Sequence, residues 1–160
     1  MARLVIIAVG RLKRVPEQAL VEDYLKRARA LLKRLGFADI ELREIAESRA
    51  DTPALRQRQE AEAILKAAGD AAALVVLDER GEDITSRQFT ERLRQQAATG
   101  RDVAIIIGGP DGLAQELRER AAWQVRFGRL TWPHRLARVM LAEQLYRAGS
   151  IAAGLPYHRD

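Results

Sequence analysis

The sequence predicts an α/β sandwich around a mostly parallel sheet, organised as a single domain spanning residues 1–160. Short runs rich in Val, Ile and Leu alternate with longer stretches whose apolar residues recur at helical spacing, a pattern typical of this class. No long linker, internal repeat or low-complexity segment interrupts the alternation. Hydrophobic residues make up 48% of the chain, which is enough to form the buried core of such a sandwich.

The residue pattern of the N-terminal part predicts two units, each a strand followed by a helix. Arg3–Val9 is apolar and β-branched, as expected of a strand buried on both faces. A helix begins at Pro16, keeps apolar residues at helical spacing and ends at Gly36, a natural terminator. Residues 40–46 alternate apolar and charged side chains, like a half-exposed strand. Asp51 or Thr52 then caps a helix that runs to about residue 69.

The C-terminal part continues the alternation. A buried strand at Ala73–Leu77 ends in the polar turn 78–81, and Thr85 with Gln88 has capping-box spacing for a helix that ends before Gly100. The remaining predicted elements are a strand at 103–107, the glycine loop 108–112, a short helix at 113–121, a short strand at 123–127, a long helix at 133–148 and an irregular tail at 149–160.

Positive charge is concentrated at the two ends of the chain. Lys and Arg number 27 against 22 Asp and Glu, a formal charge of +5. Residues 1–36 hold nine basic and three acidic side chains, and residues 101–160 hold nine and six. Solvated helix faces are the ordinary explanation, but two basic segments that a fold can bring together favour a polyanionic partner.

The residues that are absent narrow the chemistry. With no Cys, the chain has no disulfides, no Cys-ligated zinc and no thiolate catalysis, and only two His argue against a metal site. The apolar run 4–10 is too short for a signal peptide and is followed at once by Arg11, Lys13 and Arg14. No run approaches the roughly 18 apolar residues of a membrane span. We therefore expect a cytoplasmic protein without membrane or metal partners.

Three strand ends are candidates for a ligand site, because open α/β sheets bind ligands at the carboxyl ends of their strands. They are 77–81, the loop Gly-Gly-Pro-Asp-Gly at 108–112, and 127–132. Glycine lets main chain approach a ligand closely, although the same loop could be only a tight strand-to-helix turn. It has the spacing of neither a P-loop nor a dinucleotide fingerprint.

The C-terminus carries the other candidates. Tyr157, His158 and Arg159 offer an aromatic ring for stacking, a titratable imidazole and a guanidinium for phosphate, as an RNA-contacting tail would. Arg138 and Arg147 on the preceding helix are further anion-binding candidates, although helix arginines are often only solvated.

Five motifs together resemble one known family. They are Leu77-Asp78-x-x-Gly81 with Ser86 and Phe89, Ile107-Gly108-Gly109-Pro110-Asp111-Gly112-Leu113, Pro133-His134-x-Leu136-x-Arg138-Val139, Glu143-Gln144-Leu145-Tyr146-Arg147-Ala148 and Pro156-Tyr157-His158-Arg159. In length and order they are similar to the ribosomal RNA large-subunit methyltransferases H, the smallest members of the SPOUT superfamily.

The resemblance implies a homodimer that binds S-adenosylmethionine in a C-terminal trefoil knot and methylates N3 of a pseudouridine in 23S rRNA on the assembled ribosome. It places cofactor contacts at Leu77, Gly108, Gly109, Phe127, Gly128, Arg129, Leu130, Thr131 and Trp132. The segment 126–131 departs from the Leu-Ser-x-Ser-like run of that family, so backbone contacts can be retained there but serine hydroxyl contacts cannot.

Methyl transfer to an imide nitrogen is a direct displacement, which agrees with the absence of Cys. A base near neutrality would help to remove the N3 proton, and His158 is the first candidate, with His134 second. Tyr157 is assigned to orientation and Arg159 to phosphate. Two alternatives stay open: a knotted methyltransferase acting on another RNA nucleoside, and a ribosome-associated RNA-binding protein without catalysis.

Overall fold

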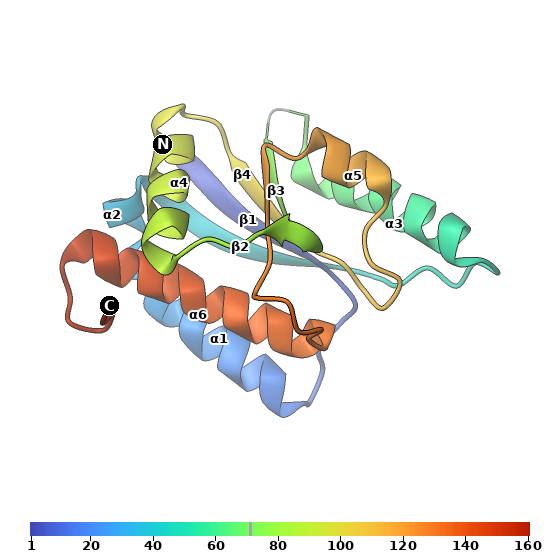
Figure 1. Cartoon of the computed structure of the whole chain (residues 1–160), viewed down its shortest axis with the longest axis horizontal. Coiled ribbons are helices and arrows are strands. Elements are labelled where there is room, and N and C mark those ends of the chain that lie inside the picture. The colour runs from blue at the N-terminus through green and yellow to red at the C-terminus, as the bar shows by residue number, and fades with distance from the viewer. Residues whose placement is uncertain (71) are drawn as a thin grey trace.

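The computed structural model describes residues 1–70 and 72–160, and its centre is a five-stranded sheet in the order β2-β1-β4-β3-β5 (Figure 1). All four strand pairs are parallel, which confirms the predicted α/β class. The strands are β1 (Ala2–Val9), β2 (Phe37–Ile45), β3 (Ala73–Glu82), β4 (Val103–Ile107) and β5 (Trp123–Val125).

Helices cover both faces of this sheet. The six described helices are α1 (Pro16–Arg29), α2 (Leu32–Leu35), α3 (Pro53–Ala68), α4 (Ser86–Ala98), α5 (Gln115–Arg120) and α6 (His134–Ala153). Leu4, Ile6 and Ala8 of β1 join one core beneath α1, α2, α4 and α6, whereas Val5, Ile7 and Val9 join a second core beneath α3 and α5. Because both faces are covered, the strand reads in sequence as an uninterrupted apolar run.

Two predicted helix boundaries were wrong. The helix predicted from Pro16 to Gly36 is interrupted at residues 30–31, and the short α2 follows before Gly36 ends it with a φ of 98°. The last helix continues past Ala148 to Ala153, and Gly149 lies inside it, against Leu31 in the turn that follows α1. A Cβ at Gly149 would lie 2.8 Å from Leu31 Cβ, so this glycine serves packing and does not end the helix.

The predicted turn at 78–81 also differs, since β3 continues as strand to Glu82. The register of β3 against β5 shifts between Leu77 and Glu82, and both of these residues pair with Val125. Gly81 lies directly on β5, where a Cβ would come within 2.6 Å of the Val125 carbonyl carbon. This irregularity turns the end of β3 toward the loop that follows β5.

Helices α1 and α6 pack side by side and run in the same direction (Figure 1). The Arg27 guanidinium lies 5.9 Å from the centre of the Tyr146 ring, and Leu31 contacts Gly149 one turn further along. The N-terminal halves of the two helices therefore lie together near the carboxyl end of β1, and their C-terminal halves lie together at the other end.

Candidate functional site

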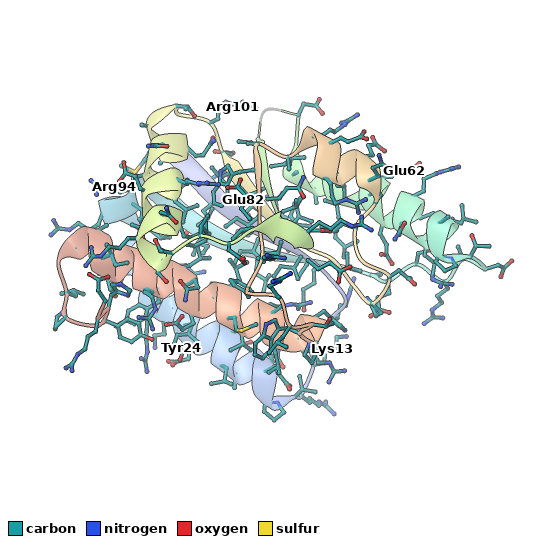
Figure 2. The ribbon with its side chains drawn as sticks, in the orientation of Figure 1. Lys13, Tyr24, Glu62, Glu82, Arg94 and Arg101 are labelled. Carbon is teal, nitrogen blue, oxygen red and sulfur yellow. The ribbon has the colours of Figure 1, made fainter. Side chains whose placement is uncertain are left out.

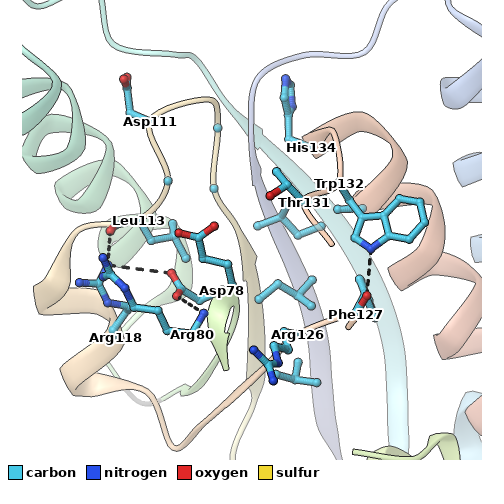
Figure 3. A pocket seen from close by; sticks show the side chains of 18 of the residues that line it. Asp78, Arg80, Asp111, Leu113, Arg118, Arg126, Phe127, Thr131, Trp132 and His134 are labelled. Atoms are coloured by element: carbon cyan, nitrogen blue, oxygen red, sulfur yellow. Dashed lines mark hydrogen bonds and ion pairs between the residues drawn. The ribbon is translucent and has the colours of Figure 1, made fainter. Parts of the chain in front are cut away.

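A pocket of about 540 Å³ opens at the carboxyl ends of β3, β4 and β5 (Figure 3). Its walls come from residues 77–80, 107–113, 125–128 and 130–132, together with side chains from α3, α5 and α6. Eight of the nine predicted cofactor residues line it: Leu77, Gly108, Gly109, Phe127, Gly128, Leu130, Thr131 and Trp132. Arg129 is exposed and is not part of the lining. The topology thus brings the three strand ends singled out in the sequence to one cavity.

The glycine loop forms the floor between β4 and α5. The Gly112 amide donates to the Gly109 carbonyl at 3.0 Å, and Gly112 takes the left-handed φ of 75° that closes the turn. A Cβ at Gly109 would lie 3.0 Å from Val9 Cγ1, so a larger residue would displace the loop. Gly109 therefore matters for its close contact with β1, whereas the turn depends on the left-handed backbone of Gly112.

Helix α3 holds this loop through two of its side chains, Arg56 and Gln57. The Arg56 guanidinium donates to both Asp111 carboxylate oxygens, at 2.7 and 3.2 Å, and to the Ala50 carbonyl at 2.9 Å. Gln57 Nε2 donates to the Asp111 carbonyl at 2.7 Å. The Arg56 hydrogen bonds lower the pKa of Asp111 and keep it ionised. Sequence reasoning missed both α3 residues, because no motif links them to a loop more than fifty positions away.

Polar side chains form a second wall of the pocket. Asp78 accepts a hydrogen bond from the Arg80 amide at 2.9 Å, and its carboxylate lies 3.9 Å from the Arg118 guanidinium (Figure 3). Arg118 also donates to the Leu113 carbonyl at 2.8 Å, which joins α5 to the glycine loop. The Asp78 side chain is only 9% exposed, so this carboxylate offers a partly desolvated negative charge at the pocket wall.

The segment after β5 is held by two interactions. Arg126 forms a two-pronged ion pair with Asp83, at 2.8 and 2.7 Å, and thereby lowers the pKa of that carboxyl. Trp132 Nε1 donates to the Phe127 carbonyl at 2.9 Å, which closes the segment into a compact loop (Figure 3). Leu130 is 76% exposed and Trp132 is 43% exposed, so both leave apolar surface at the rim of the pocket.

His134 is the imidazole that lines the pocket. Burial lowers its pKa, the nearby Arg138 and Arg135 lower it further, and Glu47 opposes them. It is therefore neutral at physiological pH and able to accept a proton. Its Nδ1 is buried without a hydrogen-bond partner among the described residues.

The tail residues lie away from this pocket, against the C-terminal half of α6. Glu143 accepts hydrogen bonds from Tyr157 Oη at 2.8 Å and from Arg147 Nη2 at 2.6 Å. Arg147 Nη1 lies 3.1 Å from His158 Nδ1, and His158 Nε2 lies 2.8 Å from Asp160. His134 and Arg147 are separated along α6 by about 20 Å at 1.5 Å per residue. Within one chain, the tail and the pocket are at opposite ends of this helix (Figure 1).

The two predicted RNA-binding arginines occupy different environments. Arg138 is 2% exposed; it donates to Glu44 at 2.7 Å and to the Gly10 carbonyl at 2.9 Å. That burial leaves no surface for a phosphate, so the prediction of an RNA contact at Arg138 is corrected to a structural role. Arg147 is partly exposed and engaged with Glu143 and His158, and Arg159 is exposed at the end of the tail.

The described residues hold no group of three or more His, Asp or Glu side chains arranged to bind a metal ion. Within the same part of the chain, no helix is both long and apolar enough to cross a membrane.

Comparison with known proteins identifies the class to which this fold and pocket belong. The family described as "Predicted SPOUT methyltransferase" matches residues 2–158. The chain belongs to this family of SPOUT methyltransferases. A solved structure, "a probable methylase family protein" from Haemophilus influenzae Rd KW20, shares the fold with a TM-score of 0.51 and 17% identity, covering 99% of this chain and 70% of that one.

More similar relatives carry a more specific name. A protein of Cereibacter sphaeroides (strain ATCC 17023) is 50% identical over 157 residues, 98% of this chain and 99% of its own length. A protein of Methylocella silvestris is 49% identical over 159 residues, 99% of each chain. Both are named "Ribosomal RNA large subunit methyltransferase H".

Proposed function

We propose that this protein transfers the methyl group of S-adenosylmethionine to N3 of a pseudouridine in the 23S rRNA of the large ribosomal subunit. The observation that carries the proposal is the near-complete match, at about half identity, to relatives named as methyltransferases of large-subunit ribosomal RNA. The substrate, a ribosome, implies that the enzyme works in the cytoplasm.

The pocket suits S-adenosylmethionine in size and composition. A volume of about 540 Å³ lies within the range of sites for ligands of this size. Leu77, Ile107 and Leu130 supply apolar surface for an adenine ring, and main chain of the glycine loop supplies hydrogen-bonding groups. The Asp78 carboxylate, held beside Arg118, supplies a hydrogen-bond acceptor at the wall. When bound, this cofactor supplies a methyl group attached to a positively charged sulfur.

The residues of the chain have two tasks in such a reaction. They align the target nitrogen with the methyl carbon, so that the N–C bond forms as the S–C bond breaks, and they receive the proton that leaves N3. His134 is neutral and lines the pocket, so it is placed to accept this proton in the same chain. His158 can do so only where another chain brings a tail to the pocket.

We therefore include a homodimer in the proposal. Of the seven exposed large hydrophobic side chains among the described residues, four lie on or just before the N-terminal halves of α1 and α6. They are Leu20, Leu130, Trp132 and Leu136. Apolar surface near a pocket is typical of a protein interface. A second copy packed there in the opposite orientation would bring its Tyr157, His158 and Arg159 toward the pocket of the first.

The test uses ribosomes from a strain whose copy of this gene is deleted. The purified protein and S-adenosylmethionine should add one methyl group to a pseudouridine of 23S rRNA, located by mass mapping of nuclease fragments. Methylation of another nucleoside would replace the proposed substrate. If calorimetry shows that the cofactor binds but neither ribosomes nor RNA are methylated, the protein is a binding protein and not a methyltransferase.

A further inference from the structure

The loop between β1 and α1 presents three cations in a fixed arrangement. Arg11, Lys13 and Arg14 are exposed, while Leu12 between them is buried at 5% exposure. The Leu12 amide donates to Glu44 Oε2 at 2.9 Å. The buried leucine therefore anchors the loop, and its basic neighbours point to solvent.

The backbone on both sides of Leu12 is also fixed. The Gly10 amide donates to the Ile45 carbonyl at 2.7 Å, and the Gly10 carbonyl accepts from the buried Arg138. Arg14 has a left-handed φ of 54°, the one non-glycine residue in the described chain with positive φ, and its amide donates to Gln18 Oε1 at 2.9 Å. A non-glycine residue keeps this conformation only where its surroundings require it.

The charges of this loop are not neutralised by carboxylates. None of Arg11, Lys13 and Arg14 forms an ion pair in the described structure, whereas Arg27 and Arg29 further along α1 pair with Asp23 and Asp39. Of the two acids beside the loop, Glu44 is itself paired with Arg138 at 2.7 Å, and Glu47, which lies against Gly10, forms no ion pair with the three cations in the described structure. The loop thus keeps a net positive charge at the surface.

This positive surface adjoins the pocket. Val9, the last residue of β1, packs against Gly109 of the glycine loop, and Gly10 lies against the ring of the pocket residue His134. In the view of Figure 2, Lys13 lies at the same end of the molecule as the first turn of α6. Arg135, in the first turn of α6, is exposed and also forms no ion pair in the described structure.

We propose that Arg11, Lys13 and Arg14, with Arg135, bind phosphates of the rRNA backbone and seat the RNA beside the pocket. This inference rests on the proposed function, which it extends by naming the surface that recognises the polyanion. Exposed Arg and Lys side chains on a rigid backbone suit phosphates, because they give affinity and orientation without reading base sequence. Arg138, which the sequence suggested as an RNA contact, holds the Gly10 end of this loop from below.

The test compares two double variants of equal charge. Arg11→Gln/Lys13→Gln removes two cations of the loop and leaves Arg14, with its special backbone, in place. Arg58→Gln/Lys66→Gln removes one Arg and one Lys from α3, on the other face of the sheet, where both are exposed and form no ion pair in the described structure. Binding of each protein to unmodified ribosomes is measured over a range of salt concentrations, without cofactor. Cofactor affinity is measured separately by calorimetry.

The loop variant should bind ribosomes about tenfold more weakly, with the slope of log K against log salt reduced by about 1.5, since each lost phosphate contact removes about 0.7–0.9. The α3 variant should keep the wild-type slope, and both should keep wild-type cofactor affinity. An unchanged slope in the loop variant, or an equal loss in both, overturns the inference. Dissociation of the loop variant into monomers in sedimentation also overturns the inference, because the loop would then contact a second copy of the chain and not RNA. Failure of the proposed function would instead appear in the wild type, as ribosome binding without methylation.

Discussion

Arg56 and Asp111 join helix α3 to the glycine loop of the pocket through a two-pronged ion pair, with N–O distances of 2.7 and 3.2 Å. Arg56 and Gln57 of α3 hold both the carboxylate and the carbonyl of Asp111. The glycines beside Asp111 line the pocket, so these contacts fix the position of the pocket wall. The pair therefore reduces the conformational freedom of the loop before any ligand binds.

Arg56→Met should weaken cofactor binding roughly tenfold by leaving the loop less ordered. Arg56→Lys should recover part of the loss, because lysine keeps the charge without the fork. Arg58→Met, on the same helix, is the matched control. Calorimetric titration with S-adenosylmethionine measures all three. An Arg56→Met protein with wild-type affinity would show that the loop keeps its shape unaided.

Gly109→Ala should weaken cofactor binding, since its Cβ would lie 3.0 Å from Val9 Cγ1 and push the loop from its position. Gly109→Val should abolish binding. Combining Gly109→Ala with Val9→Ala should restore affinity, because the smaller residue in β1 makes room for the added methyl group. Calorimetry gives the affinities, and thermal unfolding shows whether each variant is folded. If the double variant binds no better than Gly109→Ala alone, the contact with Val9 is not the cause.

Arg138→Met should lower the free energy of unfolding by about 3 kcal/mol, because the Gly10 carbonyl loses the Arg138 donor and the Glu44 carboxylate loses its ion pair and keeps only the Leu12 amide. Arg135→Met, three residues earlier on the exposed face of α6, should change it by less than about 0.5 kcal/mol. Urea denaturation followed by circular dichroism compares them. Equal urea midpoints for the two variants would show that Arg138 does not stabilise this end of β1.

Much of this fold was predictable, because the β-branched runs and the Pro and Gly boundaries are local signals. The strand order β2-β1-β4-β3-β5 could not be predicted, because no residue of β1 indicates that β4 is its neighbour. The extension of α6 to Ala153 was missed for a related reason: Gly149 is a helix terminator in sequence and a close contact with Leu31 in three dimensions.

The candidate site divides in the same way. Residues of the glycine loop and of 127–132 could be found because they follow strands, and the carboxyl ends of parallel strands share one edge of the sheet. Arg56 and Arg118 could not, because the carboxylates they pair with, Asp111 and Asp78, are distant in sequence. Sequence also could not show that the tail lies about 20 Å along α6 from His134. The trefoil knot stays a prediction.

The pKa of Tyr157 offers a direct probe of how the tail is held. Burial, and then the hydrogen bond to Glu143 and the negative charge of that residue, raise this pKa from 10.0 to about 12. A raised pKa favours the protonated phenol in the folded state, so tail attachment is complete below pH 10 and weakens as the pH rises toward 12. The ultraviolet titration curve of the Tyr157→Phe variant is subtracted from that of the wild type. The difference reports Tyr157 alone among the three tyrosines. A midpoint near 10 in the wild type would contradict the contact with Glu143, and Glu143→Gln should move the midpoint toward 10.

Mixed dimers decide which chain supplies the tail. His158→Ala should keep cofactor binding and lose most methylation, and Gly109→Val should lose cofactor binding. If the tail of one copy completes the pocket of the other, a heterodimer of the two variants contains one intact site, formed by the pocket of the first variant and the tail of the second. Random exchange gives heterodimers as half of all dimers, so an equal mixture should recover about a quarter of wild-type activity.

A site completed within one chain gives no recovery in this mixture, because each protomer then carries one defect. The control is the double variant His158→Ala/Gly109→Val mixed with wild type. Its heterodimers contain no intact site in the crossed arrangement, since the wild-type pocket faces the altered tail. They contain one if each chain uses its own tail. Two results together would establish the crossed arrangement: activity that rises in the first mixture, and activity that falls to about a quarter of wild type in the second. Only a site built from the pocket of one chain and the tail of the other gives both results.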